Sequence, residues 1–257
     1  MNKLSAPVND RLYAESSSLR RPPVKSWTMN ILALETSTEL GSCALWQDGI
    51  VVERFCPVGQ SHSETLLPLL GAMLSEADLS VAQLDGIAFG VGPGAFTGLR
   101  VACGIAQGLA VAHDISLFPV VSLEAMAESL GAEKVISLLD ARMGEVYAAC
   151  YQRSGDGFRL NGQILVASPA EVILPDGATW QACGNAPSAY PVLMQRLIDA
   201  GISFDSKVLP TAAALARLAA PRVARGEGID AALAVPLYVR DKVAKTVAER
   251  LIEGGRA

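Results

Sequence analysis

Short apolar runs separated by polar turns recur along most of the chain. Three of these runs end at a polar or glycine-containing turn, which predicts buried strands at 29–37, 85–92 and 117–123. Residues 41–55 contain two apolar runs on either side of Asp48-Gly49, a dipeptide typical of tight turns, and therefore predict a β-hairpin.

Longer segments between these strands place their apolar residues at helical spacing. Residues 61–79 predict a helix with Ser63 as a candidate N-cap, and Pro68 must lie in its first turns or kink it. Residues 96–112 predict a second helix, and a short third helix reaches Leu130. Strands that alternate with helices indicate an α/β fold.

The second half of the chain begins on the same plan as the first. Residues 135–158 give an apolar strand that ends at Asp140, a polar turn, and a hairpin around Asp156-Gly157, and Glu35 holds the matching place in the first half. This repeat favours two lobes, 29–132 and 133–257, each with a β-hairpin and an α/β layer. Such a plan is similar to the two-lobed actin-like ATPase (ribonuclease H-like) fold, in which each lobe's first hairpin points at nucleotide phosphates.

Charge and composition narrow the function classes. Residues 1–28 carry five basic and two acidic side chains, a net +3, which leaves −5 − 3 = −8 for residues 29–257. An acidic body argues against binding of nucleic acid by this chain alone. The segment 1–28 has no apolar core of a secretory signal, and we interpret it as a disordered leader or an extension upstream of a start at Met29. The five scattered cysteines are typical of free thiols in the cytoplasm, and no run is long enough to predict a membrane span.

The residues give little support for metal or nucleotide chemistry. The two histidines, His62 and His113, are far apart in the sequence, so a metal site built on imidazole is not predicted. The glycine-rich loop 90–95 matches the dinucleotide fingerprint only formally and lacks the lysine of a phosphate-binding P-loop. The turns "ETST" (35–38) and "DARM" (140–143) lack the glycine with which actin-like folds approach phosphate. We therefore interpret loop 90–95 as a packing turn.

Five segments in order resemble the bacterial TsaB family, formerly YeaZ. They are "NILALETSTELGSCAL", "SHSETLLPLL", "GIAFGVGPGAFTGLRVACGIAQGLA", "LDARMGEVYAACY" and "PLYVRD". The resemblance implies the actin-like fold and a non-catalytic scaffold role in making threonylcarbamoyladenosine in tRNA. It also implies that the chain pairs with the paralogue TsaD, is joined by TsaE, and meets tRNA only through the complex. A homodimer and a nucleotide at the partner interface stay open, and the free chain is expected to have no cofactor.

A kinase or ATPase of the same fold is the alternative function. It is disfavoured by the missing turn glycines. If the chain is a scaffold subunit, the two helices 61–79 and 96–112 should present a partner surface that is exposed in the monomer. Its predicted members are His62, Leu66, Leu67, Leu70, Met73, Leu74, Leu99, Arg100, Cys103, Ala106, Gln107 and Ala110. No catalytic or metal-binding residue is predicted.

Overall fold

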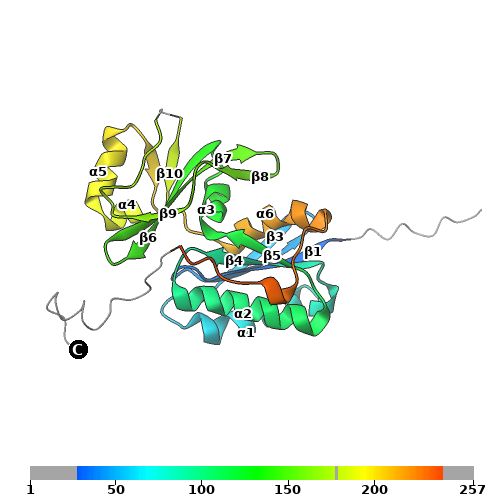
Figure 1. The fold of residues 1–257 in the computed structure, drawn as a ribbon. Helices are drawn as coiled ribbons and strands as arrows, with labels where there is room; N and C mark the ends of the chain where they lie inside the picture. The colour runs from blue at the N-terminus through cyan, green and yellow to red at the C-terminus, as the bar shows by residue number, and fades with distance from the viewer. Residues whose placement is uncertain (1–27, 177–178, 240–257) are drawn as a thin grey trace, which may run out of the picture.

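Two mixed β-sheets, each in its own lobe, form the framework of the protein (Figure 1). The computed structural model describes residues 28–176 and 179–239. The leader predicted at 1–28 therefore lies outside the described residues, apart from Thr28.

The first sheet has five strands in the order β3-β2-β1-β4-β5. The strands are β1 (Asn30–Glu35), β2 (Ser42–Gln47), β3 (Ile50–Phe55), β4 (Gly86–Gly92) and β5 (Leu117–Val121). β1, β2 and β3 are antiparallel, whereas β4 and β5 run parallel to β1. Asp48 and Gly49 both have positive φ between β2 and β3, so the predicted hairpin turn is confirmed.

The second sheet repeats this order as β8-β7-β6-β10-β11. Its strands are β6 (Lys134–Arg142), β7 (Glu145–Ser154), β8 (Gly157–Leu160), β10 (Gln181–Cys183) and β11 (Ser203–Asp205). β9 (Leu165–Ala167) pairs with the first half of β7, on the edge opposite β6, and β8 pairs with the last residues of β7. In both sheets a three-stranded antiparallel meander is followed by two parallel strands. The two-lobed actin-like plan predicted from the repeat is confirmed.

Six helices and two 3₁₀ turns are described in residues 28–176 and 179–239. They are α1 (His62–Glu76), α2 (Phe96–His113), α3 (Ser122–Leu130), α4 (Ala186–Ala189), α5 (Pro191–Asp199) and α6 (Ala212–Ala224), with the short 3₁₀ turns η1 (Val81–Gln83) and η2 (Ala231–Leu233). α1, α2 and α6 cover the two faces of the first sheet, whereas α4 and α5 pack on the second. α1 and α2 pack on one face of the first sheet, where their leucines meet Leu32, Leu34 and Phe89. α6 packs on the other face with a run of alanines that allows close approach (Figure 1).

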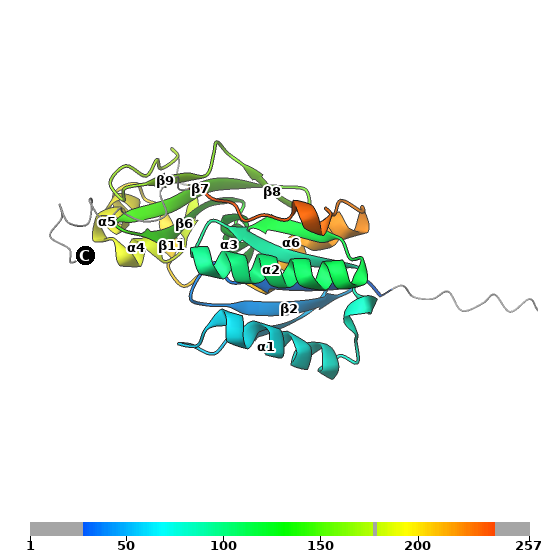
Figure 2. The same ribbon diagram turned by 60° about the horizontal axis from the view of Figure 1, so that its bottom comes forward.

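Two segments cross between the lobes. The α6 helix comes from the second half of the sequence yet packs on β1 and β2, whereas α3 packs Leu123 and Met126 against β6. Residues 229–239 also return to the first lobe and run beside α2 (Figure 2). A lobe boundary at residue 132 thus separates the strands of the two sheets. It does not separate the helices, because some helices pack on the sheet of the other lobe.

The start of α1 differs from the sequence prediction. Ser61, not Ser63, is the N-cap residue, and its side chain makes no capping bond to the backbone. The Ser61 and Ser63 hydroxyls instead bond each other at 2.6 Å. Pro68 lies well inside the helix, which continues through it to Glu76.

Candidate functional site

The carboxylate of Glu35, at the end of β1, is fully buried and serves internal packing. The Ser37 amide donates to its Oε1 at 2.6 Å and the Ser122 hydroxyl donates to its Oε2 at 2.9 Å. A Cβ at Gly90 would overlap this carboxyl group, so the glycine of β4 makes room for it. Burial raises the pKa of Glu35, and the hydrogen bonds lower it by less, so the pKa stays above its usual value.

Asp140 holds the equivalent position at the end of β6 but has a different environment. Its Oδ1 accepts a hydrogen bond from the Tyr190 hydroxyl at 2.7 Å, and its Oδ2 lies 3.2 Å from Arg142 Nη1. Burial and this hydrogen bond to Asp140 raise the pKa of Tyr190 to about 12. The second amine of Arg142 lies 3.8 Å from Glu39 in the opposite lobe. Asp140 therefore positions a guanidinium that bridges the cleft between the lobes.

The backbone of the β6–β7 hairpin directs Arg142 into the cleft. A bulge interrupts the strand register between Asp140 and Arg142. Arg142 and Met143 both have left-handed φ values, 60° and 56°, which are uncommon for residues with a side chain. Bulges of this kind commonly re-aim a side chain beside a site. Here the hairpin tip leaves a cavity of only about 80 Å³ between the lobes, smaller than the roughly 300 Å³ of a small ligand pocket.

The glycine-rich loop after β4 packs directly on the turn that follows β1. The Ala95 amide donates to the Ser37 carbonyl at 2.7 Å, and the Thr36 hydroxyl donates to the Gly98 carbonyl at 2.7 Å. A Cβ at Gly94 or Gly98 would collide with backbone atoms of this turn. These glycines therefore let α2 begin in close contact with the β1 turn.

The partner surface predicted on the two helices needs a correction. Eight of its twelve residues lie in the first lobe's own core, and the expectation that they are exposed is wrong. These are Leu66, Leu70, Met73, Leu74, Leu99, Cys103, Ala106 and Ala110. The arc that they span on each helix is wide because the sheet covers one part of it and the neighbouring helix or residues 229–239 cover the rest.

The remaining four predicted residues are at least partly accessible. Two of them bind residues 229–239, which we call the returning chain. Gln107 Nε2 donates to the carbonyls of Ala231 and Ala234 at 3.0 and 3.1 Å. Arg100 Nε donates to the Tyr238 hydroxyl at 3.2 Å. His62 is the first residue of α1, and its Nε2 lies 2.9 Å from the Thr38 carbonyl. Leu67 is 49% exposed.

The sequence analysis did not predict that polar side chains on one side of α2 bind residues 231–238. Arg100, Cys103 and Gln107 lie one helical turn apart, and all three side chains contact residues 231–238. The Leu237 amide also donates to the Val91 carbonyl at 2.7 Å. A narrow polar stripe on an otherwise apolar helix was the available signal, since such groups need hydrogen-bond partners when covered.

The outward side of α2 carries two glycines with open space where a side chain would stand. Gly104 and Gly108 are exposed, and a Cβ on either would meet no described atom within 4 Å. Val111 continues this line and is 76% exposed. On α1, Gly71 is likewise open and lies one turn beyond Leu67. We call these five residues the outer helix face.

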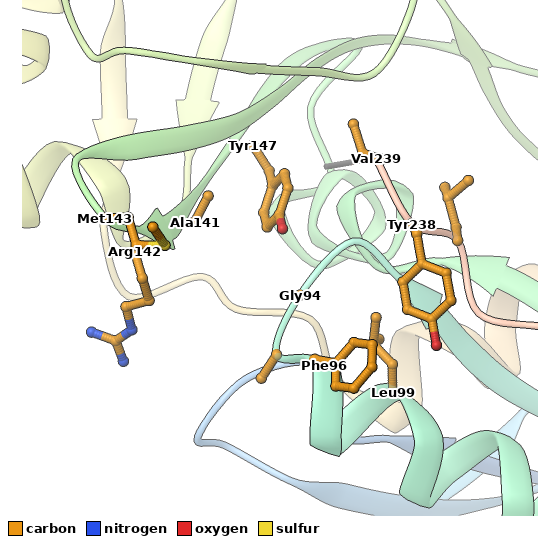
Figure 3. A pocket seen from close by; sticks show the side chains of 11 residues that line it. Gly94, Phe96, Leu99, Ala141, Arg142, Met143, Tyr147, Tyr238 and Val239 are labelled. Atoms are coloured by element: carbon orange, nitrogen blue, oxygen red, sulfur yellow. The ribbon is translucent and has the colours of Figure 1, made fainter. Parts of the chain in front are cut away.

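A second cavity, of about 210 Å³, opens at the edge of the cleft where α2 begins (Figure 3). Phe96, Tyr147 and Tyr238 stand around it, and Met143 of the hairpin tip lies on its other side. The Arg100 guanidinium stacks on the Phe96 ring at 3.8 Å from its centroid. The cavity is thus walled by both lobes and by the returning chain.

The five cysteines are free thiols, and burial raises the pKa of four of them, Cys43, Cys103, Cys150 and Cys183. Burial raises the pKa of both Cys43 and Cys183 to about 12, which keeps these thiols protonated at neutral pH. Among residues 28–176 and 179–239, no three His, Cys, Asp or Glu side chains gather in a metal-binding arrangement. In the same residues no helix is both long and apolar enough to span a membrane.

The fold and the cleft define a class of protein, and comparison with known proteins agrees with it. The two lobes, with Glu35 and Asp140 at equivalent places near the ends of their first strands, form the two-lobed actin-like (ribonuclease H-like) fold. The sequence profile of TsaD, described as tRNA N6-adenosine threonylcarbamoyltransferase, matches residues 57–247.

Within that class the chain belongs to the TsaB (YeaZ) family. It is 35% identical over 84% of its length to the tRNA threonylcarbamoyladenosine biosynthesis protein TsaB of Escherichia coli (strain K12), of which 96% is covered. It is 33% identical to the Haemophilus influenzae TsaB, with 84% of this chain and 95% of that protein covered. The solved structure of YeaZ from Pseudomonas aeruginosa aligns with a TM-score of 0.73 at 37% identity, covering 82% of this chain and 99% of that one.

Proposed function

We propose that this chain is a non-catalytic scaffold subunit of the assembly that makes threonylcarbamoyladenosine in tRNA. In this proposal it pairs with TsaD, is joined by TsaE, acts in the cytoplasm, and meets tRNA only through the complex. The free chain has no cofactor of its own, and any nucleotide is held at the interface with TsaD. Membership of the TsaB family supports the pathway.

The outer helix face is the observation that carries the pairing. A glycine in an exposed helix interior costs about 1 kcal/mol relative to alanine. Gly104 and Gly108 stand one turn apart at such positions, where no contact within the described chain needs a small residue. Small residues at this spacing let a second helix approach closely. The two glycines, which have no packing role in the monomer, would therefore have one in an assembly.

The surface between α1 and α2 also suits a protein partner. A shallow depression of about 700 Å³ runs along α1 and reaches α2, and its lining includes Leu67, Gly71 and Leu109. Leu67 in this lining is half-exposed, and Val111 adds exposed apolar area on α2. An apolar helix pair from the paralogue would cover this area and leave the polar residues at the rim in water.

The state of the cleft supports the absence of catalysis. Glu35 is fully buried in hydrogen bonds, and Arg142 is paired with Asp140 and Glu39 across the space between the lobes. Residues with side chains occupy the two turns that would approach phosphate.

The test is to mix the purified chain with the TsaD of the same organism and to follow mass by light scattering and ATP turnover in each sample. We expect a heterodimer and no turnover by this chain alone. ATP turnover by the chain alone that is abolished by Asp140→Asn would favour the alternative, an autonomous ATPase. A chain that forms only homodimers in the presence of TsaD would contradict the pairing.

A further inference from the structure

The outer helix face is small for a stable pairing surface. It consists of five residues, and three of them are the glycines Gly71, Gly104 and Gly108, which have no side chain to contribute. A specific and stable interface usually takes about 20–30 residues from each partner. A protein that packs on the outer helix face must therefore also cover surface next to it.

The surface that adjoins this face on α1 is polar at both ends. Leu67 and Gly71 lie on a line at helical spacing that begins at Glu64 and continues to Ser75, and both of these end residues are exposed. Asp78 follows three positions later and is exposed too. Charged residues are depleted at the centres of protein interfaces, so this flank suits the rim of a pairing surface rather than its core.

The flank of α2 away from α1 is occupied by the returning chain, which is apolar on two sides (Figure 2). Its inward side chains pack in the core of the first lobe, and they are Ile229, Ala231, Ala234 and Leu237. Its outward side chains remain accessible, with Leu233 66%, Val235 67% and Tyr238 48% exposed. We call Leu233, Val235 and Tyr238 the outward strip.

The outward strip borders the outer helix face. α2 holds the returning chain through the side chains of Arg100 and Gln107. Gly104 lies one helical turn after Arg100, and Val111 lies one turn after Gln107. Residues one turn apart are neighbours on a helix surface, so the anchors of the returning chain and the outer helix face lie side by side on α2.

We propose that the outward strip is a second part of the surface that pairs with TsaD, where it meets an apolar side of that partner. The inference rests on the proposed function and extends the pairing surface named there. TsaD is the occupant because the strip adjoins the face on which TsaD packs, and that face needs more area than its own five residues supply. Leu233 and Val235 carry no charge and no hydrogen-bonding side chain, so apolar groups of the partner stabilise this contact.

Hydroxyl-radical footprinting tests the strip in the unaltered chain. In the chain alone, mass spectrometry should find oxidation at Leu233, Val235 and Tyr238, because all three are accessible. With saturating TsaD, the oxidation rate at these residues should fall about fivefold or more, because the cores of interfaces are packed as closely as protein interiors. Ile173, a residue of the second lobe that is 71% exposed, is the internal control and should be oxidised at the same rate in both samples.

Substitutions test whether the strip contributes to affinity. Leu233→Glu should weaken association with TsaD about tenfold or more, because the new carboxylate loses water when the partner covers it. Leu233→Met keeps an apolar side chain and should bind as the unaltered chain does. Ile173→Glu makes the charged change at the control position and should also bind normally. Isothermal titration calorimetry measures the dissociation constants, and circular dichroism verifies that each chain is folded.

The outcomes separate this inference from the pairing itself. If Gly108→Glu weakens binding but Leu233→Glu and the footprint of the strip show no change, the pairing stands and the inference is wrong. If the strip is protected and Leu233→Glu weakens binding whereas Gly108→Glu does not, the inference stands and the outer helix face is not the pairing surface.

Two further results would overturn the inference. Protection of the strip in the concentrated chain without TsaD would identify a second copy as the occupant. The absence of any complex with TsaD would contradict both the inference and the proposed function. If Leu233→Glu does not fold, the footprint of the unaltered chain decides.

Discussion

Glu35 and Ser122 join β1 to the first turn of α3 through a hydrogen bond of 2.9 Å between buried side chains. The Ser37 amide is the other donor to this carboxylate, and no cation pairs with it among the described residues. The buried Glu35 carboxylate is therefore held by neutral hydrogen-bond donors alone. The link thus couples the core of the first lobe to the helix that packs on the second.

The first prediction concerns the pH dependence of this link. Because burial raises the pKa of Glu35, the protonated form is favoured in the folded state, and the stability it contributes is lost as pH rises through that raised pKa. Glu35→Gln keeps the shape without the charge. It should raise the free energy of unfolding by about 1–2 kcal/mol at pH 8 and change it little at pH 4.

Urea unfolding of both proteins across this pH range measures the difference. Glu133→Gln, at an exposed glutamate, is the matched control and should show no such trend. A difference for Glu35→Gln that stays constant with pH would show that the effect is one of packing rather than charge.

The second prediction separates the core side of the helices from their outer side. Leu70→Glu and Ala106→Glu each place a carboxylate at a buried position and should destabilise the lobe by about 4 kcal/mol or more. Leu67→Glu changes a half-exposed residue of α1. Its free energy of unfolding should stay within about 0.5 kcal/mol of that of the unaltered chain. Denaturant titration followed by circular dichroism measures all three. Normal folding of Ala106→Glu would contradict the packing of α2 on the sheet.

The third prediction concerns the returning chain. Gln107→Ala removes two hydrogen bonds, to the Ala231 and Ala234 carbonyls, and should cost about 1–2 kcal/mol of local stability. Hydrogen exchange should therefore quicken at residues 229–239 and stay unchanged in β6. The same substitution at Gln195, which bonds Asp199 on the surface, should leave that exchange alone.

The fourth prediction concerns RNA. Because residues 29–257 carry a net charge of −8, the chain starting at Met29 should bind tRNA weakly at about 0.15 M salt. Fluorescence anisotropy with labelled tRNA measures this, and the full chain is the comparison. Tight binding by the chain starting at Met29 would contradict a role for the complex in holding tRNA.

The sequence predicted the fold well because local patterns determine it. The Asp48-Gly49 turn, the apolar runs and the repeated strand–acid–turn order each depend on neighbours in the chain. Local patterns could not show which side of α1 and α2 faces the sheet and which side faces outward. Whether Ala106 faces the sheet or a partner depends on residues 229–239, which reach α2 from more than a hundred positions away. The cavity beside Phe96 was missed for the same reason, since its walls come from three distant segments.

The most direct test of the central claim is the affinity of Gly108→Glu for TsaD, measured by isothermal titration calorimetry beside the unaltered chain. The substituted chain should unfold at the same or higher denaturant concentration, because glutamate is a better helix former than glycine and the position is open. Its association with TsaD should weaken by about 100-fold or more, since the new carboxylate would be buried without a partner. Ser129→Glu, at an exposed position on α3, should bind normally. If Gly108→Glu folds normally and binds TsaD as tightly as the unaltered chain, the outer helix face is not the pairing surface.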